Sequence, residues 1–325
     1  MKNILVTGGA GYIGSHTVRE LTETGYKVFV YDNLSEGHSE SVSGMPLIKS
    51  DINDTNALNE VFGKNKIDAV MHFCAFAYVG ESVENPEKYY KNNVAATINL
   101  LSAMRANGVK NFIFSSSCAT YGEPQYTPID EKHPQHPVNP YGETKYMVER
   151  ILDSYSKAYD FNYVALRYFN AAGAHPDGSI GESHRIETHL IPLVLKTLTG
   201  EKDSIKMFGS DYDTKDGTCI RDYIHVCDLA KAHRRSIEYI TSGEKSICIN
   251  LGTGVGTSVK EIISACESVT GLKVPVIVEG RRAGDPSVLT ANYTLAEKIL
   301  DFKPEFANIK DTIKTAWAWE QNRKF

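Results

Sequence analysis

The fold of this chain is decided by the stretch Thr7-Gly8-Gly9-Ala10-Gly11-Tyr12-Ile13-Gly14, which joins a strand-like run to a helical pattern. Glycines at this spacing, between a strand and a helix, are typical of dinucleotide-binding folds. We expect Gly8 to permit a tight turn, Gly11 to let the backbone approach a pyrophosphate, and Gly14 to let the helix pack on the strand. The helix N-terminus then supplies free N–H donors for the anion.

A carboxylate follows where a bound dinucleotide would place its ribose. The second strand-like run ends at Asp32, 18 residues after Gly14. An acidic side chain there accepts hydrogen bonds from the adenosine ribose hydroxyls and repels a 2′-phosphate. No arginine follows at once, so we expect NAD rather than NADP. Asp51, after the third run, is a candidate for the adenine, and a helix cap is the alternative interpretation of this residue.

The first half of the chain alternates between strand-like and helical patterns. This alternation predicts an α/β fold in which helices cover both faces of a Rossmann-type, doubly wound parallel sheet. The strand-like runs are Asn3 to Thr7, Val28 to Asp32, Leu47 to Lys49, Ala69 to Phe73, Asn111 to Ser115 and Val164 to Phe169.

From about Ala171 the pattern changes to shorter elements separated by glycine-rich and polar loops. We therefore expect an NAD-binding domain over residues 1–170 and a smaller α/β substrate-binding domain over residues 171–325. A strand near residues 247–250 is expected to join the first sheet. The other expected elements are helices near 228–240 and 258–269 and a strand near 274–278.

Tyr141 and Lys145 have the Tyr-x-x-x-Lys spacing that puts both side chains on one face of a helix. Asn139 can cap that helix and Pro140 suits its first position, so Tyr141 lies in the first turn, where the helix dipole favours a phenolate. Shifting a tyrosine pKa from about 10 to about 7 requires roughly 4 kcal/mol. An ammonium about 4 Å away supplies roughly that much at an effective dielectric of about 20. The alternative is a tyrosine and a lysine on an ordinary solvated helix.

Composition narrows the class of partner and compartment. The chain has 325 residues, with 35 Lys and Arg against 40 Asp and Glu, and neither sign forms a long run. This balance argues against nucleic acid or an anionic membrane as the main partner. The six cysteines have no C-x-x-C spacing, and no apolar stretch approaches membrane-spanning length. We therefore expect a soluble protein of the cytoplasm.

Further segments in both halves of the chain share a single family pattern, and those of the second half are the more specific. By them the chain resembles the extended short-chain dehydrogenase/reductase family over essentially its whole length, and within it the nucleotide-sugar 4-epimerases. The segments are Val79-Gly80-Glu81-Ser82, Asn92-Asn93-Val94, Ser115-Ser116-Ser117, Pro140-Tyr141-Gly142, Arg167-Tyr168-Phe169-Asn170, Gly217-Thr218, Arg221-Asp222-Tyr223-Ile224-His225, Arg282 and Gly284-Asp285.

The resemblance implies reversible, NAD-dependent epimerisation at C4 of UDP-glucose and UDP-galactose, through a transient 4-keto sugar and NADH. In this scheme Tyr141 is the base, Ser117 relays or shares the O4 proton, and Lys145 binds the nicotinamide ribose and lowers the tyrosine pKa. The implied cofactor residues are Gly8, Gly11, Tyr12, Ile13, Gly14, Asp32, Asn33, Asp51, Ile52, Phe73, Asn92, Tyr141, Lys145 and Phe169. The implied UDP-sugar residues are Ser117, Asn170, His189, Leu190, Phe208, Arg221, Arg282, Asp285 and Leu289.

The resemblance also assigns roles within the substrate set. It places Arg221 and Arg282 on the diphosphate, whose oxygens match the guanidinium fork, and Asp285 on the uridine ribose. Taken singly, each arginine can also be a surface or salt-bridge residue. The family further implies a homodimer, built from the helices that follow Pro86 and Pro140.

Three positions depart from the family pattern. Ala77 stands where many of these epimerases have a lysine near the cofactor, and His189 where many have an asparagine near the diphosphate. Leu289 stands four residues after Asp285, where the family has a tyrosine or a cysteine facing the sugar. These changes concern substrate range more than reaction class.

Other reactions remain as alternatives. A 4-epimerase of UDP-N-acetylhexosamines or UDP-pentoses would share every group named above. A sugar-nucleotide dehydratase would need an Asp-Glu pair where this chain has Cys118 and Ala119. A non-catalytic NAD-binding module would be expected to have lost the acid–base residues, which are present here.

Overall fold

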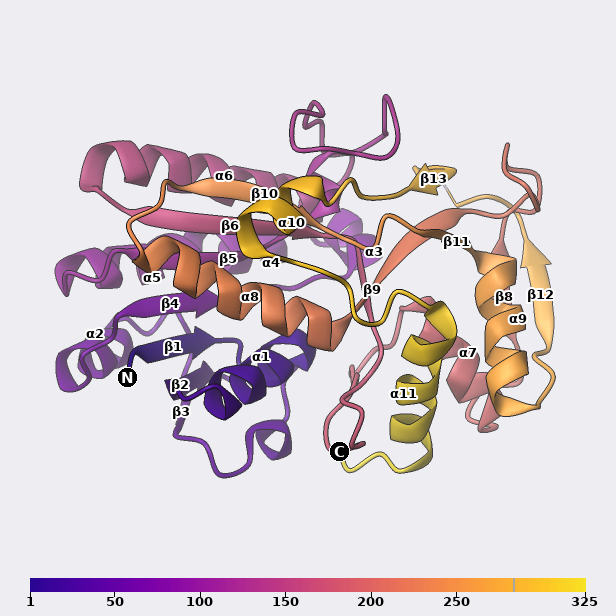
Figure 1. Ribbon diagram of the computed structural model, residues 1–325, viewed down its shortest axis with the longest axis horizontal. Coiled ribbons are helices and arrows are strands. Elements are labelled where there is room, and N and C mark those ends of the chain that lie inside the picture. Colours follow the sequence, from indigo (N-terminus) through magenta and orange to yellow (C-terminus); the bar gives the residue numbers. More distant parts are fainter. Residues whose placement is uncertain (283) are drawn as a thin grey trace.

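A seven-stranded parallel sheet forms the centre of the computed structural model, which describes residues 1–282 and 284–325 (Figure 1). The strand order is β10-β6-β5-β4-β1-β2-β3. Because β1 and β4 are neighbours, the chain winds outward in both directions from this pair, and the predicted doubly wound sheet is confirmed. The strands are β1 (Asn3–Thr7), β2 (Lys27–Asp32), β3 (Leu47–Lys49), β4 (Ala69–His72), β5 (Asn111–Ser117), β6 (Asn162–Tyr168) and β10 (Ile247–Leu251).

Helices cover both faces of this sheet because its strands are apolar on both sides. On β1, Ile4 and Val6 belong to one apolar core and Leu5, between them, to the other. The first core is completed by α1 (Tyr12–Glu23), α8 (Val226–Thr241) and α10 (Thr294–Leu300). The second is completed by α2 (Thr55–Lys64), α5 (Ala96–Ala106) and α6 (Pro140–Tyr159).

The second half of the chain builds a smaller unit beside the carboxyl ends of these strands (Figure 1). Its sheet has the order β11-β9-β13, with β7 also paired to β9, and a separate pair joins β8 to β12. These strands are β7 (Asn170–Ala172), β8 (Ile205–Phe208), β9 (Ile220–His225), β11 (Gly256–Ser258), β12 (Val276–Glu279) and β13 (Val288–Leu289). Helices α7 (Leu190–Leu198), α9 (Val259–Thr270) and α11 (Ile309–Gln321) share its apolar core.

Short helical segments connect these elements at the edge where the candidate site lies. They are η1 (Ser39–Val42), α3 (Val79–Glu84), α4 (Pro86–Tyr89), the π-helix η2 (Tyr90–Ala95) and η3 (Cys118–Thr120). None of the helices within the described ranges is both long enough and apolar enough to cross a membrane.

The two halves are interlaced rather than joined end to end. Strand β10 pairs in parallel with β6 at the edge of the large sheet, with Ile247 opposite Val164. Helix α8, also from the second half, packs against α1 and the same sheet. The division at residues 170 and 171 stays a prediction, because segments from both sides of it share one core.

Candidate active site

The turn after β1 has the conformation that its glycines permit. Gly8 has a φ of +73°, and a Cβ there would lie 2.6 Å from the backbone nitrogen of Cys74. A Cβ on Gly14 would lie 2.2 Å from the Gly8 carbonyl oxygen, so α1 can approach the turn only with glycine at this position. Gly11 is the N-cap of α1 and offers no capping side chain. The first N–H groups of the helix are therefore available to an anion.

The helix entry itself links the two halves of the molecule. The Tyr12 hydroxyl donates a hydrogen bond to the Gly173 carbonyl oxygen at 2.6 Å, and burial raises the pKa of this phenol well above its usual range. Ile13 packs against the apolar core of the large sheet. Tyr12 and Ile13, which the resemblance assigns to the cofactor, thus also make contacts within the protein itself.

Asp32 is a buried carboxylate held by the turn that it faces. Its Oδ2 accepts from the Ala10 backbone N–H at 2.9 Å and its Oδ1 from the Leu34 N–H at 2.8 Å. Burial raises the pKa of Asp32 against the effect of these two bonds. Each carboxylate oxygen has a second lone pair, so the group can also accept from ribose hydroxyls.

Asp51 does not cap the helix that follows it. The N-cap of α2 is Asp54, which accepts from two backbone N–H groups of the first turn. Asp51 instead accepts from the Asn33 side chain at 2.7 Å and from the Asn53 backbone N–H at 2.8 Å. Ile52 beside it is buried. The helix-cap interpretation of Asp51 is therefore wrong, and Asp51 and Asn33 form one polar pair at the end of β2 and β3.

Of the next two predicted cofactor residues, Asn92 lies on a π-helical turn and Phe73 directly follows β4. Asn92 lies on η2 and donates from Nδ2 to the Oδ1 of Asn93 at 2.9 Å. Asn93 holds the backbone of Phe76 through two hydrogen bonds and donates to the Thr144 hydroxyl at 3.1 Å. Phe73, directly after β4, packs on the first core. The π-helix thus joins the loop after β4 to α6, and such turns are frequent at functional sites.

Helix α6 begins as the sequence predicts. The Asn139 side chain accepts from the Gly142 N–H at 2.9 Å, and Pro140 occupies the first turn. Tyr141 is therefore fixed at the start of the helix, next to the end of β5. Ser117, the last residue of β5, is buried, and its Oγ accepts from the Ala119 N–H at 3.1 Å.

Lys145 is a buried ammonium group on the face that Tyr141 shares. Its side chain is 3% exposed, and Nζ donates to the Ser115 carbonyl oxygen at 2.7 Å. Nζ lies 5.8 Å from the centre of the Tyr141 ring. Burial lowers the pKa of Lys145 to about 7. The interpretation as an ordinary solvated helix is therefore wrong for this residue.

The expected low pKa of Tyr141 is not a property of the protein alone. Burial raises the pKa of Tyr141 to about 12, although the hydrogen bond with Ser117 acts in the opposite direction. With a pKa of about 7, Lys145 is only partly protonated at neutral pH, so it supplies less than the roughly 4 kcal/mol that the sequence argument assigned to a full positive charge. Additional positive charge is needed before this tyrosine can act as a base near neutral pH.

The predicted substrate arginines have partners within the protein. Arg221, on β9, forms an ion pair with Asp285 and donates to the Ile220 carbonyl oxygen at 2.8 Å. Arg282 lies with its guanidinium carbon 4.2 Å from the centre of the Phe208 ring. Asp285 thus holds the guanidinium of Arg221, and the ring of Phe208 holds that of Arg282.

Two further groups of residues complete the predicted substrate side. Asn170, His189 and Leu190 line one small cavity together with Tyr223. Leu289 packs in a separate cluster with Phe169 and with Cys118, the neighbour of Ser117. Strand pairing sets Leu289 opposite Arg221. Leu289 therefore lies between the predicted diphosphate arginine and the end of β5.

Asp222 is a positioning residue that the sequence analysis did not identify. This fully buried carboxylate accepts from the Thr253 and Gly254 N–H groups at 2.8 and 2.9 Å and from the Ala291 N–H at 3.1 Å. It fastens β9 to the loop after β10 and to the segment after β13. Asp222 is part of the sequence motif around Arg221. Its role was not recognised, because the residues that it binds are remote in sequence.

A cluster of two glutamates and two histidines was also missed. Glu182, His184, Glu187 and His189 place one ligand atom each within 4.8 Å of all the others. Although burial alone would lower it, contacts with Glu182 and Glu187 raise the pKa of His184 to about 10. The spacing Glu-x-His-x-x-Glu-x-His was the available sequence signal, and the analysis considered only His189.

The fold and this constellation of residues define an NAD-dependent enzyme of the epimerase and dehydratase class. The model of the NAD dependent epimerase/dehydratase family matches residues 4–252, and the chain belongs to this family. A UDP-glucose 4-epimerase of Rhizobium leguminosarum bv. trifolii is 50% identical over 318 residues, which is 98% of this chain and 97% of that protein.

Solved structures agree with this membership. The UDP-glucose 4-epimerase of Brucella ovis, in complex with NAD, superposes with a TM-score of 0.96 at 50% identity and covers 98% of both chains. The Bifidobacterium longum UDP-glucose 4-epimerase, in complex with NAD+ and UDP, gives a TM-score of 0.93 at 40% identity and covers 99% of both chains. The chain therefore matches these enzymes over nearly their whole length.

Proposed function

We propose that this enzyme interconverts UDP-glucose and UDP-galactose by NAD-dependent epimerisation at C4. The observation that carries the proposal is the arrangement of Ser117, Tyr141 and Lys145. All three lie at the carboxyl end of β5, on the same side of the sheet edge as the glycine turn. A buried lysine on the same helix face as a tyrosine is costly for stability, and a proton-transfer function explains its presence.

The residues of the first half fit a dinucleotide. Uncapped N–H groups begin α1 beside the open space at Gly11, where an added Cβ would contact only the Gly8 carbonyl oxygen, at 3.4 Å. Asp32 offers ribose acceptors 22 residues beyond Ala10, whose N–H it already binds. Lys145 offers donors for the second ribose of the dinucleotide.

Side chains of the protein transfer the proton of the sugar O4 hydroxyl. When bound, NAD supplies a cationic ring that takes up the C4 hydride and returns it. Tyr141 accepts the proton of the sugar O4, and Ser117 shares or relays it over a short path. Lys145, when protonated, adds positive charge that favours the phenolate. Because its pKa is about 7, this contribution grows as the pH falls below neutrality.

The second half would hold the nucleotide so that the sugar can turn. Arg221 and Arg282 meet the diphosphate, Asp285 the uridine ribose, and Asn170 and His189 lie beside them. With the UDP fixed, the keto sugar can rotate about its phosphate linkage and present its other face. Holding both reactants on one protein makes the return step unimolecular, which contributes much of the rate. The remaining substrate contacts in this proposal are Leu190, Phe208 and Leu289.

Dehydration is a poorer fit to this site. Cys118 and Ala119 open η3, where a dehydratase would need an acid and a base. Burial raises the pKa of the Cys118 thiol to about 12, so it neither donates nor accepts a proton readily at neutral pH.

We propose further that the enzyme acts in the cytoplasm as a homodimer. Val79 and Val83 on α3, which packs against α6, and Ile98 on α5 are exposed apolar side chains, and a second copy would cover them. All six cysteines are free thiols, which suits a reducing compartment.

The test is an incubation of the purified protein with UDP-galactose and no added reductant. The expected result is an equilibrium mixture with UDP-glucose, formed by protein that retains its bound NAD. Accumulation of NADH in proportion to product would instead identify a dehydrogenase. Bound NAD without conversion of any UDP-sugar in a panel of hexoses, pentoses and N-acetylhexosamines would identify a non-catalytic module.

A further inference from the structure

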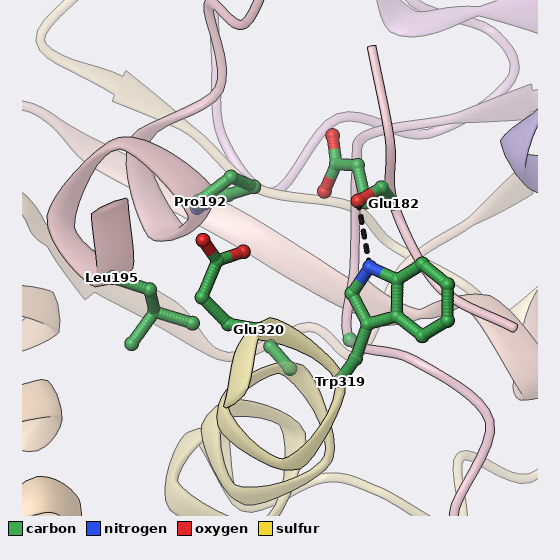
Figure 2. A pocket seen from close by; sticks show the side chains of 7 residues that line it. Glu182, Pro192, Leu195, Trp319 and Glu320 are labelled. Carbon is green, nitrogen blue, oxygen red and sulfur yellow. Dashed lines mark hydrogen bonds between the residues drawn. The ribbon is translucent and has the colours of Figure 1, made fainter. Parts of the chain in front are cut away.

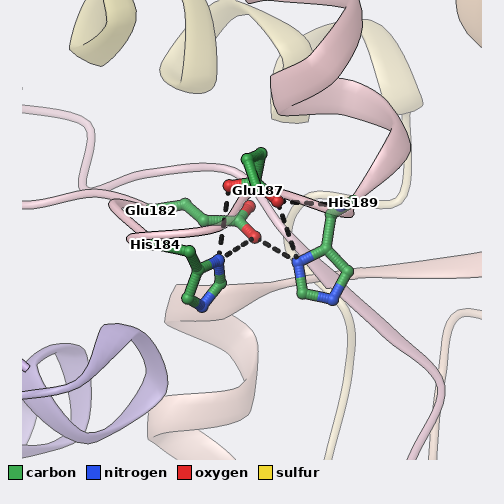
Figure 3. A group of neighbouring side chains, drawn as sticks. All are labelled: Glu182, His184, Glu187 and His189. Carbon is green, nitrogen blue, oxygen red and sulfur yellow. Dashed lines mark hydrogen bonds and ion pairs between the residues drawn. The ribbon is translucent and has the colours of Figure 1, made fainter. Parts of the chain in front are cut away.

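The segment from Glu182 to His189 folds back so that four side chains face one point (Figure 3). The Nδ1 atom of each histidine is turned inward. The Glu182 Oε1 atom lies 3.3 Å from Nδ1 of His184 and 2.5 Å from Nδ1 of His189. Glu187 approaches the same two nitrogens at 3.3 and 3.5 Å, with one carboxylate oxygen each.

These separations match the ligand shell of a small divalent cation. In a tetrahedral zinc site, nitrogen and oxygen ligands lie about 2.0–2.2 Å from the metal, which puts neighbouring ligand atoms about 3.3–3.6 Å apart. Three of the four distances between Nδ1 and carboxylate atoms fall at 3.3–3.5 Å. Only the shorter contact, between Oε1 of Glu182 and Nδ1 of His189, would have to lengthen for these atoms to surround a cation.

The charge and burial of the cluster favour an internal cation. The side chains of Glu182 and Glu187 are 5% and 3% exposed, so two carboxylates are withdrawn from water at one point. Buried charges of one sign require partners of the other sign. In the metal-free protein the two histidines are these partners, because their contacts with the carboxylates raise both imidazole pKa values against the effect of burial. A divalent cation would displace the two imidazole protons and balance both carboxylates while leaving the imidazoles neutral, the form in which they ligate metals.

Neighbouring groups hold the ligands in this arrangement. The Trp319 ring donates from Nε1 to the Glu182 carbonyl oxygen at 2.9 Å, as Figure 2 shows. The Glu187 Oε1 atom accepts from the backbone N–H groups of Thr188 and His189, both at 2.8 Å. Such outer contacts orient metal ligands and tune their affinity.

We propose that Glu182, His184, Glu187 and His189 form a structural site for a divalent first-row cation, with Zn²⁺ as the best match to two nitrogen and two oxygen ligands. Four protein ligands leave no open position, which is typical of structural rather than catalytic zinc. The site would fix the loop that leads into α7. It uses Nδ1 of His189, so Nε2 of the same ring remains available to the substrate. The proposal stands independently of the epimerase reaction.

The experiment uses the full-length protein, freed of metal by chelation, with Zn²⁺ alone and no nucleotide sugar. Calorimetric titration should give one site per chain, and added Zn²⁺ should raise the thermal unfolding midpoint. Co²⁺ should give the intense visible absorption of four-coordinate cobalt. His184→Gln should weaken Zn²⁺ binding at least ~10-fold and lose the thermal shift. His136→Gln, at an exposed histidine outside the cluster, should bind as the parent does.

Several outcomes would overturn the site. They are a parent protein that binds no Zn²⁺, a weak octahedral cobalt spectrum, and a His184→Gln variant that binds as the parent does, which would place the metal elsewhere. If His184→Gln misfolds, as judged by circular dichroism, Glu182→Gln replaces it, because the amide retains the size of the side chain. The cobalt spectrum of the parent decides the coordination in either case.

Discussion

Lys145 bears a charge that the folded protein disfavours, since burial takes its pKa from 10.5 to about 7. Between these values the unfolded chain binds one proton more than the folded chain, so this residue makes the stability of the NAD-free protein rise with pH. The cost of burying the charge is fully present below about pH 7 and disappears as the pH approaches 10.5.

We predict that Lys145→Met removes this dependence. Urea unfolding of NAD-free parent and variant from pH 7 to 10 should show the stability difference changing by at most about 1.4 kcal/mol per pH unit, with the parent gaining. Lys157→Met is the matched control, because this lysine lies on the same helix with its side chain 75% exposed. The stability of the control should change with pH as the stability of the parent does. If the stability of Lys145→Met also ran parallel to that of the parent, Lys145 would titrate normally.

For Tyr141→Phe we expect kcat to fall by at least about 10²–10⁴-fold, the range for a lost acid–base group. The ring still packs, so bound NAD, measured after denaturation, should remain at the parental amount. Tyr146→Phe removes a hydroxyl from the same helix and should leave kcat unchanged. Near-parental kcat in Tyr141→Phe would rule out the proposed base.

Asp32→Ala should weaken NAD binding and leave UDP binding unaltered, because its carboxylate faces only the glycine turn and the start of the next loop. The purified variant should contain less NAD and regain activity when excess NAD is added. The NAD content of Asp32→Asn, which keeps one acceptor oxygen, should lie between that of the parent and that of Asp32→Ala. Full NAD content in Asp32→Ala would mean that the carboxylate serves the fold alone.

At the residue scale, the sequence predicted what depends on local spacing. Asn139 caps α6, and Gly8 and Gly14 take the positions that their motif requires. It did not predict the ion pair of Arg221 with Asp285, whose members are 64 positions apart. It also misjudged the Tyr141 pKa, because desolvation depends on the neighbours that burial brings.

At the scale of elements, the short strands of the second half position the residues that we propose to face the sugar. Strand β13 contains two residues and is held by parallel pairing to β9. So short a strand has no periodic signal, and the sequence analysis expected none there. The strands of the first half and the helices expected near residues 228–240 and 258–269 were predicted to within two residues, because their apolar patterns extend over several pleats or turns.

Leu289 on β13 gives a prediction about substrate range. An apolar wall at this position excludes added bulk by contact alone, which typically discriminates by about 10- to 200-fold. UDP-N-acetylglucosamine should therefore be converted more slowly than UDP-glucose, but measurably. Leu289→Tyr should suppress the N-acetyl activity selectively and spare the conversion of UDP-galactose.

Val288 provides the control for this element, because neighbouring residues of a strand point to opposite faces. Val288→Ala should change neither activity. Equal loss of both activities in Leu289→Tyr, or no N-acetyl activity in the parent, would exclude Leu289 as the determinant.

At the scale of the whole molecule, the shared core predicts one cooperative unfolding transition. Both tryptophans, Trp317 and Trp319, lie on α11 in the second half, so their fluorescence reports that half alone. Far-ultraviolet circular dichroism reports all helices and strands. Urea curves from the two signals should coincide, because β10 and α8 bind the halves together. Two separated midpoints would show independent domains and support the division at residue 170.

The position of β10 at the edge of the large sheet also affects how the protein is made. Strand β6 is complete at Tyr168, but β10, which covers its free edge, ends 83 residues later at Leu251. At a synthesis rate of about 5–20 residues per second, that interval lasts roughly 4–17 s. Throughout it the nascent chain carries a row of unpaired backbone N–H and C=O groups, which readily recruit other strands. The nascent chain is therefore most exposed to pairing with other chains before β10, the last strand of this sheet, is translated.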